Sequence, residues 1–192
     1  MSELDKELLT LGEVRSLLAL RGEGALTRLF GEDPVLVIRL DEEDDGLFNT
    51  PQRSYRAEPL DDTKVSPSTA VMERSPVLSK MTRSTNRVVP VRKSERNPFA
   101  GLITIGRARN NDLRLRSARI SKMHGWLSCG PDGGWRIKDH DSTNGTFVNG
   151  ERAEKGAEVP VRSGDELCLG DVEALFLDLP GLQGLCALLA SD

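Results

Sequence analysis

The sequence predicts a mainly β protein, in which a β-sandwich of about ten or eleven short strands follows a helical extension and a flexible linker. Three observations support this fold class. Short apolar runs separated by turn residues recur throughout the second half of the chain. The 18 Gly and 10 Pro residues suit a protein with many turns. The first half instead combines a helical pattern with a long polar stretch.

Residues 1–33 are the predicted helical extension. Leucines recur there at three- and four-residue spacing with charged residues between them, which is the pattern of an amphipathic helix. Ser2 is the expected N-cap and Gly22 the expected stop, and a second short helix is expected from Ala25 to Phe30. The apolar stripe has two interpretations: it packs on the protein's own domain, or it binds a partner or a second copy.

Residues 34–86 are the predicted linker, with one possible strand at residues 35–40. That strand is apolar throughout and would have to join a sheet formed elsewhere. From Asp41 to about Asn86, acidic residues, Ser, Thr and Pro dominate, which is typical of a flexible segment.

Residues 87–180 are the predicted sandwich. The expected strands are Val88–Val91, Leu102–Ile105, Leu113–Leu115, Trp126–Cys129, Trp135–Lys138, Thr146–Val148, Val159–Val161, Leu167–Leu169 and Val172–Leu177. Pro90 lacks a backbone donor and so predicts an edge strand. The dipeptide Asn149-Gly150 is favoured in type I′ hairpins. Residues 181–192 are a C-terminal tail, with a helical turn expected from Leu182.

Charge and cysteine content narrow the class of protein. Residues 87–192 hold 15 Lys/Arg against 14 Asp/Glu, so this half lacks the basic surplus typical of a nucleic-acid binder. Cys129, Cys168 and Cys186 are widely spaced and are interpreted as reduced thiols, and no metal or cofactor is expected. Since the chain shows neither a signal-peptide pattern nor a membrane-length apolar run, we expect a cytoplasmic protein without membrane association.

Three turn-like segments in the second half share hydrogen-bond donors or positive charge: Gly106-Arg107, Ser121-Lys122 and Ser142–Gly145. Short strand-like runs flank each of them. A β scaffold that brought these turns together would form a pocket for a compact anion.

Five motifs in one order resemble the forkhead-associated (FHA) domain, a phosphothreonine-binding β-sandwich. They are Gly106-Arg107, Asn111–Leu113, Ser121–His124, Ser142–Thr146 and Val148–Gly150. The resemblance covers about residues 87–180 and implies a non-enzymatic signalling adaptor that captures a phosphothreonine. It also implies a partner in Ser/Thr kinase signalling, either a kinase or its substrate.

The resemblance assigns five residues to phosphothreonine binding, and their chemistry suits that role. Arg107 carries a planar fork of donors that matches two phosphate oxygens. Ser121 offers a hydroxyl, and Lys122 offers a second cation. Asn144 is expected to bond the backbone of the bound peptide, and Thr143 is expected to assist.

Three further residues are expected to support the site: Gly106, His124 and Gly145. The resemblance implies that His124 braces the Ser121 loop through a ring hydrogen bond. A hydrolase arrangement of Ser121, His124 and Asp139 is the enzymatic alternative, but the chain has no G-x-S-x-G element there.

Two departures from the family pattern and one possible metal site lie close to these motifs. Asp141 stands where the family commonly has a small or polar residue; it opposes a phosphate if its carboxylate points into the pocket, and otherwise pairs locally, for example with Arg119 or Lys122. Gly125 replaces the usual Ala and is interpreted as a minor change. The acids flanking His140 do not suggest a metal, because adjacent side chains on a strand point apart.

The linker and the fold leave two functional hypotheses open. In the first, Thr63, Thr69 or Thr85 is phosphorylated and folds back onto the pocket, with Thr69 preferred and Thr85 the weakest candidate. In the second, the domain is a scaffold or oligomerisation module that does not depend on phosphate. The oligomeric state is left open.

Overall fold

The computed structural model describes residues 9–22, 24–39, 81 and 83–188. Most of the predicted linker, with Thr63 and Thr69, lies outside the described residues, as does Ser2. Among the described helices, none has both the length and the apolar character needed to cross a membrane.

The described strands form two sheets. The first sheet has the order β1 (Leu9–Thr10), β3 (Arg87–Pro90), β2 (Val35–Ile38), β12 (Val172–Leu177), β11 (Glu166–Leu169), β8 (Thr146–Val148) and β9 (Glu151–Arg152). The second has the order β10 (Glu158–Val161), β7 (Trp135–Asp139), β6 (Gly125–Cys129), β4 (Ile103–Gly106) and β5 (Leu113–Arg114). Neighbouring strands are antiparallel except β4 and β5, which are parallel. The predicted β-sandwich is therefore confirmed.

The main core lies between the two sheets. Leu36 of β2 and Phe176 of β12 contribute to it from the first sheet, and Ile105, Leu127 and Ile137 contribute from the second. Each of these side chains is at most 2% exposed. Full burial of such a side chain contributes about 1.5–3 kcal/mol, so this cluster is a main source of stability for the sandwich.

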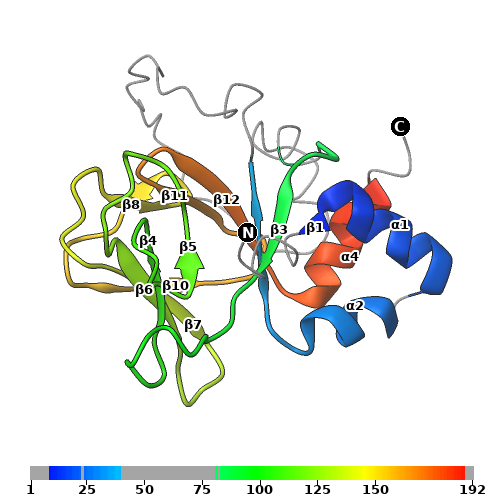
Figure 1. Cartoon of the computed structure of the whole chain (residues 1–192), viewed down its shortest axis with the longest axis horizontal. Coiled ribbons are helices and arrows are strands. Elements are labelled where there is room, and N and C mark those ends of the chain that lie inside the picture. Colours follow the sequence, from blue (N-terminus) through cyan, green and yellow to red (C-terminus); the bar gives the residue numbers. More distant parts are fainter. Residues whose placement is uncertain (1–8, 23, 40–80, 82, 189–192) are drawn as a thin grey trace, which may run out of the picture.

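A second hydrophobic cluster lies on the other face of the first sheet. Val37 of β2 and Leu175 of β12 point away from the main core, toward α1 (Leu11–Arg21), α2 (Gly24–Phe30) and α4 (Leu179–Leu188). These three helices group on one side of the molecule, beside β2 and β3 (Figure 1). Because β2 is covered on both faces, its sequence is apolar at every position instead of alternating.

The helical extension is docked on the sheet, as the first interpretation of its stripe expected. Leu11 and Val14 are fully buried in the second cluster. The prediction of Ser2 as the N-cap is wrong for α1, because Leu9 and Thr10 are extended and pair with β3. Thr10 is the cap: its hydroxyl accepts from the Glu13 backbone N–H, and the Glu13 carboxylate accepts from the Thr10 N–H. The predicted stop at Gly22 is confirmed by its φ of 70°.

The prediction that Pro90 marks an edge strand is wrong, because β3 lies between β1 and β2. The physical reason is the shortness of β1, which pairs only with Arg87 and Val88. Pro90 therefore lies beyond the end of β1, and its missing N–H removes no bond to that strand.

The first sheet draws on residues outside the predicted sandwich at 87–180. β2 pairs with β3 on one side and with β12 on the other, so a strand from the predicted linker stands inside the sheet. The limits of the predicted domain stay a prediction, but a fragment that began at residue 87 would lack this strand.

The remaining strands follow the predicted positions to within a few residues, and the hairpin signal is confirmed. Asn149 and Gly150 have φ values of 50° and 83°, as a type I′ turn requires, and they join β8 to β9. The C-terminal apolar run forms α4, which is longer than the single turn expected.

Candidate functional site

Three loops at one end of the sandwich are joined by hydrogen bonds. The Arg107 N–H donates to the Ser121 carbonyl at 2.9 Å, and the Ala108 N–H donates to the Lys122 carbonyl at 3.1 Å. The Thr143 N–H donates to the Ser121 hydroxyl at 3.2 Å, and the two hydroxyls are 3.5 Å apart. The end of β4, the loop before β6 and the loop before β8 thus meet, as the sequence predicted.

Arg107 lies at the rim of these loops with an exposed side chain. Its Nε donates to the Ile120 carbonyl at 3.0 Å. This bond fixes the direction of the guanidinium, and within the described part of the chain its two terminal nitrogens make no further hydrogen bond. The fork of donors is therefore oriented and available to an anion.

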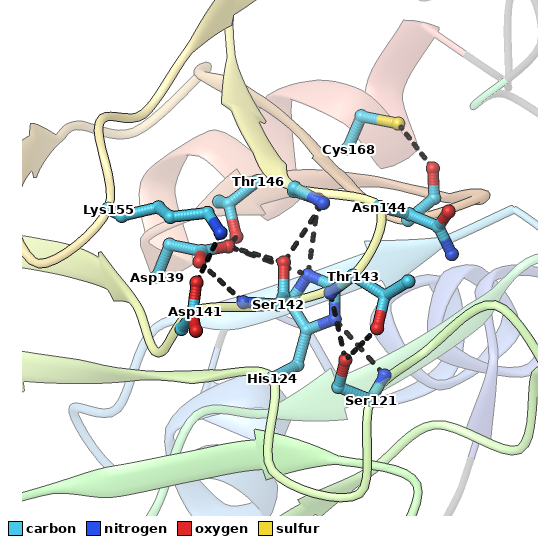
Figure 2. Close-up of polar contacts among 12 residues, drawn as sticks. Ser121, His124, Asp139, Asp141, Ser142, Thr143, Asn144, Thr146, Lys155 and Cys168 are labelled. Carbon is cyan, nitrogen blue, oxygen red and sulfur yellow. Dashed lines mark hydrogen bonds and ion pairs between the residues drawn. The ribbon is translucent and has the colours of Figure 1, made fainter.

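Asn144 occupies the exposed side of the third loop, next to Thr143 (Figure 2). Its Nδ2 donates to the Arg119 carbonyl at 2.7 Å. The side chain that was expected to bond a peptide backbone thus also ties its loop to the loop before β6.

Gly106 is required by close packing of the backbone. A Cβ atom at this position would lie 2.4 Å from the Lys122 carbonyl oxygen and 2.7 Å from Asn111 Nδ2. The buried Asn111 amide donates to the carbonyls of Ala108 and Lys122, at 3.1 and 2.7 Å. No role was predicted for Asn111 from its motif, although a polar residue after a turn is a common signal for such bonding.

His124 is fully buried and makes the ring hydrogen bond that was expected of it. Nδ1 accepts from the Ser121 backbone N–H at 3.4 Å, and Nε2 lies 3.2 Å from the Gly145 carbonyl. The ring is therefore the neutral tautomer with its proton on Nε2, because Nδ1 must accept and Nε2 must donate. Burial lowers the pKa of His124 and outweighs the nearby charge of Asp139, which raises it. His124 links the loop of Ser121 to that of Gly145.

The buried carboxylate of Asp139 holds the third loop through hydrogen bonds. Its carboxylate accepts from the Ser142 N–H at 2.8 Å, the Ser142 hydroxyl at 2.6 Å and the Thr146 hydroxyl at 2.8 Å (Figure 2). Burial raises the pKa of Asp139, but the hydrogen bonds from Ser142 and Thr146 outweigh it, so the net pKa is lowered. The Ser142 hydroxyl in turn accepts from the Gly145 N–H at 2.9 Å. This hydrogen-bond network was not predicted from the sequence, where its signal is an Asp three residues before a Ser.

The geometry does not form the hydrolase arrangement of Ser121, His124 and Asp139. The Ser121 hydroxyl contacts Thr143, while the ring of His124 is occupied by two backbone groups. Asp139 lies 4.0 Å from Nε2 and uses its oxygens on Ser142 and Thr146. No group of three or more His, Cys, Asp or Glu suited to a metal ion occurs among the residues that the structure describes.

Asp141 points away from the candidate pocket. It forms an ion pair with Lys155, on the opposite side of the loop from Ser121 and Asn144 (Figure 2). The expectation of a local partner is met, but the partner differs from the two suggested by the sequence. Asp141 has a φ of 53°, a left-handed conformation that Asp tolerates better than most residues, and glycine adopts it without strain.

The interpretation of Gly125 as a minor change is wrong. β6 and β7 approach so closely there that a Cβ atom would lie 2.3 Å from the Lys138 carbonyl oxygen. An Ala at this position would force the two strands apart, directly behind His124.

Part of the second half of the chain matches a known domain family. The family model of the FHA domain matches residues 103–170, from the start of β4 to the turn after β11. The ABC transporter ATP-binding/permease protein Rv1747 of Mycobacterium tuberculosis is 37% identical over 78 residues, which are 41% of this chain and 9% of that protein. Serine/threonine-protein kinase RAD53 of Saccharomyces cerevisiae is 34% identical over 87 residues, which are 44% of this chain and 10% of that kinase. The chain thus spans about a tenth of the length of these two curated relatives.

Two solved structures are similar as well. The N-terminal FHA domain of Saccharomyces cerevisiae Rad53p, in complex with a phosphothreonine peptide, is 30% identical with a TM-score of 0.37; the match covers 40% of this chain and 67% of that one. Mycobacterium tuberculosis EmbR, in complex with a low-affinity phosphopeptide, is 29% identical with a TM-score of 0.41, covering 49% and 22% of the two chains. The family match contains all five predicted binding residues, and residues 103–170 of this chain are therefore matched to the FHA domain.

Proposed function

We propose that this protein is a phosphothreonine-peptide-binding signalling adaptor whose ligands are Arg107, Ser121, Lys122, Thr143 and Asn144. FHA domains are non-catalytic phosphopeptide-binding modules, and the match at residues 103–170 supports this function for the chain. The proposed activity is recognition of a modification that a Ser/Thr kinase makes, with the kinase or its substrate as the partner.

The main support for the proposal is that hydrogen-bond donors from three loops converge. The Arg107 fork is aimed by the Ile120 carbonyl, and the Ser121 hydroxyl is held 3.2 Å from the Thr143 N–H. Lys122 adds an exposed cation beside them. A phosphate group brings about −1.5 to −2 charge and three acceptor oxygens, which matches this set.

The expected affinity follows from the number of charge-assisted bonds. Each contributes about 1.5–3 kcal/mol. Three such bonds, less the cost of association, are consistent with a dissociation constant on the order of micromolar. Without the phosphate this contribution disappears, so recognition depends on phosphorylation.

Asn144 is proposed to orient the peptide. Its Nδ2 is engaged by the Arg119 carbonyl, which sets the plane of the amide. The Oδ1 then accepts a backbone N–H of the bound peptide, a contact that is insensitive to the peptide's side chains.

We further propose that phosphorylation of the linker closes the site. Thr69 and Thr63 are the candidates, since a tether of this kind raises the local concentration toward about millimolar. The surroundings of Thr85 argue against it. The adjacent Ser84 and Asn86 carbonyls accept from the backbone of α1, and Val88, three residues later, is fully buried in β3. Treatment with a Ser/Thr kinase is expected to weaken binding of an external phosphopeptide in the wild type but not in Thr69→Ala/Thr63→Ala.

Calorimetric titration of the full chain with a degenerate phosphothreonine peptide library tests the proposed function. Binding is expected for the phosphorylated library and not for its unphosphorylated form. Arg107→Ala is expected to abolish binding, with Arg28→Ala on α2 as the control for loss of an exposed Arg. The scaffold hypothesis predicts instead that Arg107→Ala leaves the partner bound, and that outcome would replace the proposal.

A further inference from the structure

The loops around the candidate site concentrate positive charge that the composition of the chain conceals. Residues 87–192 are nearly neutral, yet residues 107–122 contain six basic residues and one acid. The basic residues are Arg107, Arg109, Arg114, Arg116, Arg119 and Lys122, and all six are exposed. Only Arg107 and Lys122 are assigned to the phosphate, so the side chains of the other four arginines have no role in the proposed function.

The acid within this segment does not offset the positive charge at the surface. The side chain of Asp112 is fully buried, and its carboxylate accepts from the Ser94 N–H, the Ser94 hydroxyl and the Thr104 N–H, at 2.7, 2.7 and 2.8 Å. Burial raises the pKa of Asp112, but hydrogen bonds from Asn97 and Ser94 outweigh it and the net pKa is lowered. The ionised carboxylate also lies 3.5 Å from Lys93. The negative charge of Asp112 is therefore compensated by Lys93 and Ser94 of the loop before β4.

Three of these arginines are placed beside the predicted phosphate ligands by the backbone, and Arg116 follows Arg114 by two residues. Arg114 stands beside Gly106 in the parallel pairing of β4 and β5, and its Nε lies 3.4 Å from the Arg107 carbonyl. The carbonyl of Arg119 holds the Asn144 amide at 2.7 Å. Arg109 follows Arg107 by two residues on the same loop. We refer to Arg109, Arg114, Arg116 and Arg119 as the basic rim.

Two further acids lie near these loops. Asp171 accepts from the Ser117 hydroxyl at 2.6 Å, and Asp141 pairs with Lys155 on the far side of its loop. The Ser117 hydroxyl leaves the charge of Asp171 in place, but six exposed cations outnumber it, so positive charge predominates on the loops that carry Arg107 and Lys122.

Resting on the proposed function, we propose that the basic rim selects phosphothreonine peptides that carry further negative charge beside the phosphothreonine. The charge is a carboxylate or a second phosphate, since both bond an Arg fork in the same way. Each favourable solvent-exposed ion pair adds on the order of 1 kcal/mol, which is about fivefold in affinity.

A peptide fits this rim better than a nucleic acid does. Single-stranded nucleic acids are bound by a basic groove together with aromatic side chains on which bases stack. Residues 107–122 contain no aromatic residue, and the protein as a whole has a net charge of −4. Residues 107–122 thus concentrate positive charge beside the candidate phosphothreonine site without an aromatic platform for bases.

The test compares three phosphothreonine peptides of one length on the full chain, by fluorescence anisotropy. One has Ala at the flanking positions, one has Asp and Glu, and one has a second phosphothreonine. The variants are Arg109→Glu and Arg114→Glu, with Arg28→Glu on α2 as the matched charge reversal. The thermal unfolding midpoint of each variant checks that it is folded, and an unlabelled single-stranded oligonucleotide of equal charge serves as competitor.

We expect both acidic peptides to bind the wild type at least about fivefold more tightly than the Ala peptide. This ratio should fall toward one in Arg109→Glu and in Arg114→Glu, and at about 0.5 M salt, but not in Arg28→Glu. A gain with the second phosphate alone would assign the rim to doubly phosphorylated peptides, whereas a gain with both would assign it to acidic sequences in general.

Other results would overturn the inference and leave the proposed function distinguishable from it. Equal binding of the three peptides would show that the basic rim does not select acidic peptides, and the proposed phosphothreonine site would be unaffected. Equal displacement by the oligonucleotide would make the rim a general polyanion surface. Failure of all three peptides to bind would overturn the proposed function itself.

Discussion

On the helix-covered face of the first sheet, Val37 and Leu175 are fully buried among apolar side chains of α1, α2 and α4. At the loop end of the sandwich, His124, Asp139 and Ser142 are buried just as deeply, and each is held by hydrogen bonds. The first region can be repacked by other apolar residues of similar volume. The second cannot, because removal of one partner leaves a buried polar group unsatisfied. Stability and the positioning of the site thus rest on different chemistry.

The largest effect on stability is expected in the apolar region. Leu175→Ala removes a fully buried side chain from the second cluster and should lower the free energy of unfolding by about 2–5 kcal/mol. Phosphopeptide affinity, measured well below the unfolding midpoint, should stay unchanged. Leu20→Ala, at an 81% exposed position, is the control. A large loss of phosphopeptide affinity in folded Leu175→Ala would show that the helix-covered face and the loop end are not independent.

Gly106→Ala is expected to act mainly on the site. The added Cβ would approach the Lys122 carbonyl at 2.4 Å, so the loops of Arg107 and Ser121 must move apart. We expect an affinity loss of about tenfold or more, with a destabilisation of about 1–3 kcal/mol. Gly184→Ala in α4, where nothing lies within 4 Å, should leave affinity unchanged. An unchanged affinity in Gly106→Ala would show that the spacing of these two loops is unimportant.

His124 should make the loop network sensitive to pH. Burial lowers its pKa from the ordinary value of 6.5, so below that pH the unfolded chain takes up a proton that the folded chain does not. The contribution of His124 to stability therefore falls as the pH drops below about 6.5, by up to about 1.4 kcal/mol per pH unit. Urea unfolding at pH 7.5 and 5.5 should show a smaller pH dependence for His124→Gln than for the wild type. His140→Gln, at the exposed histidine, should behave like the wild type. If His140→Gln reduced the pH dependence and His124→Gln did not, this explanation would be contradicted.

The smallest effect is expected at Asp141. Its carboxylate is 78% exposed and pairs with Lys155 away from the pocket, so Asp141→Asn should change phosphopeptide affinity by less than about twofold. Lys122→Gln, which removes a charge at the proposed site, should cost clearly more. A marked gain of affinity in Asp141→Asn would mean that the carboxylate does oppose the phosphate.

Much of the fold could be predicted from the sequence, because strands and turns carry local signals. The apolar runs of β4, β6 and β11 and the dipeptide Asn149-Gly150 gave the sandwich and one of its hairpins. The place of β2 inside the first sheet could not be predicted, since nothing local to Val35–Ile38 specifies its partners β3 and β12. Its unbroken apolar sequence signalled only that both faces are covered.

The candidate site was likewise only partly predictable from the sequence. Arg107, Ser121 and Asn144 were predicted because their motifs occur in a recognisable order. Apart from the expected bond of His124 to the Ser121 loop, the partners of the buried polar residues nearby were not: Asp112 reaches Ser94, 18 residues earlier, and His124 also reaches Gly145, 21 residues later. Such partners are chosen by the fold, and a polar residue in the sequence does not reveal which distant group it will meet. Gly125 was misjudged for the same reason, since its neighbour is the backbone of another strand.

The central claim is that three loops form one phosphate-dependent site while the helix-covered face takes no part. Titration of the ¹⁵N-labelled full chain with a phosphothreonine peptide, followed by amide chemical shifts, tests this most directly. We predict saturable shifts at Arg107, Ser121, Thr143 and Asn144, none in α1 and α2, and none anywhere with the unphosphorylated peptide. Shifts confined to α1 and α2, or equal shifts with both peptides, would contradict it.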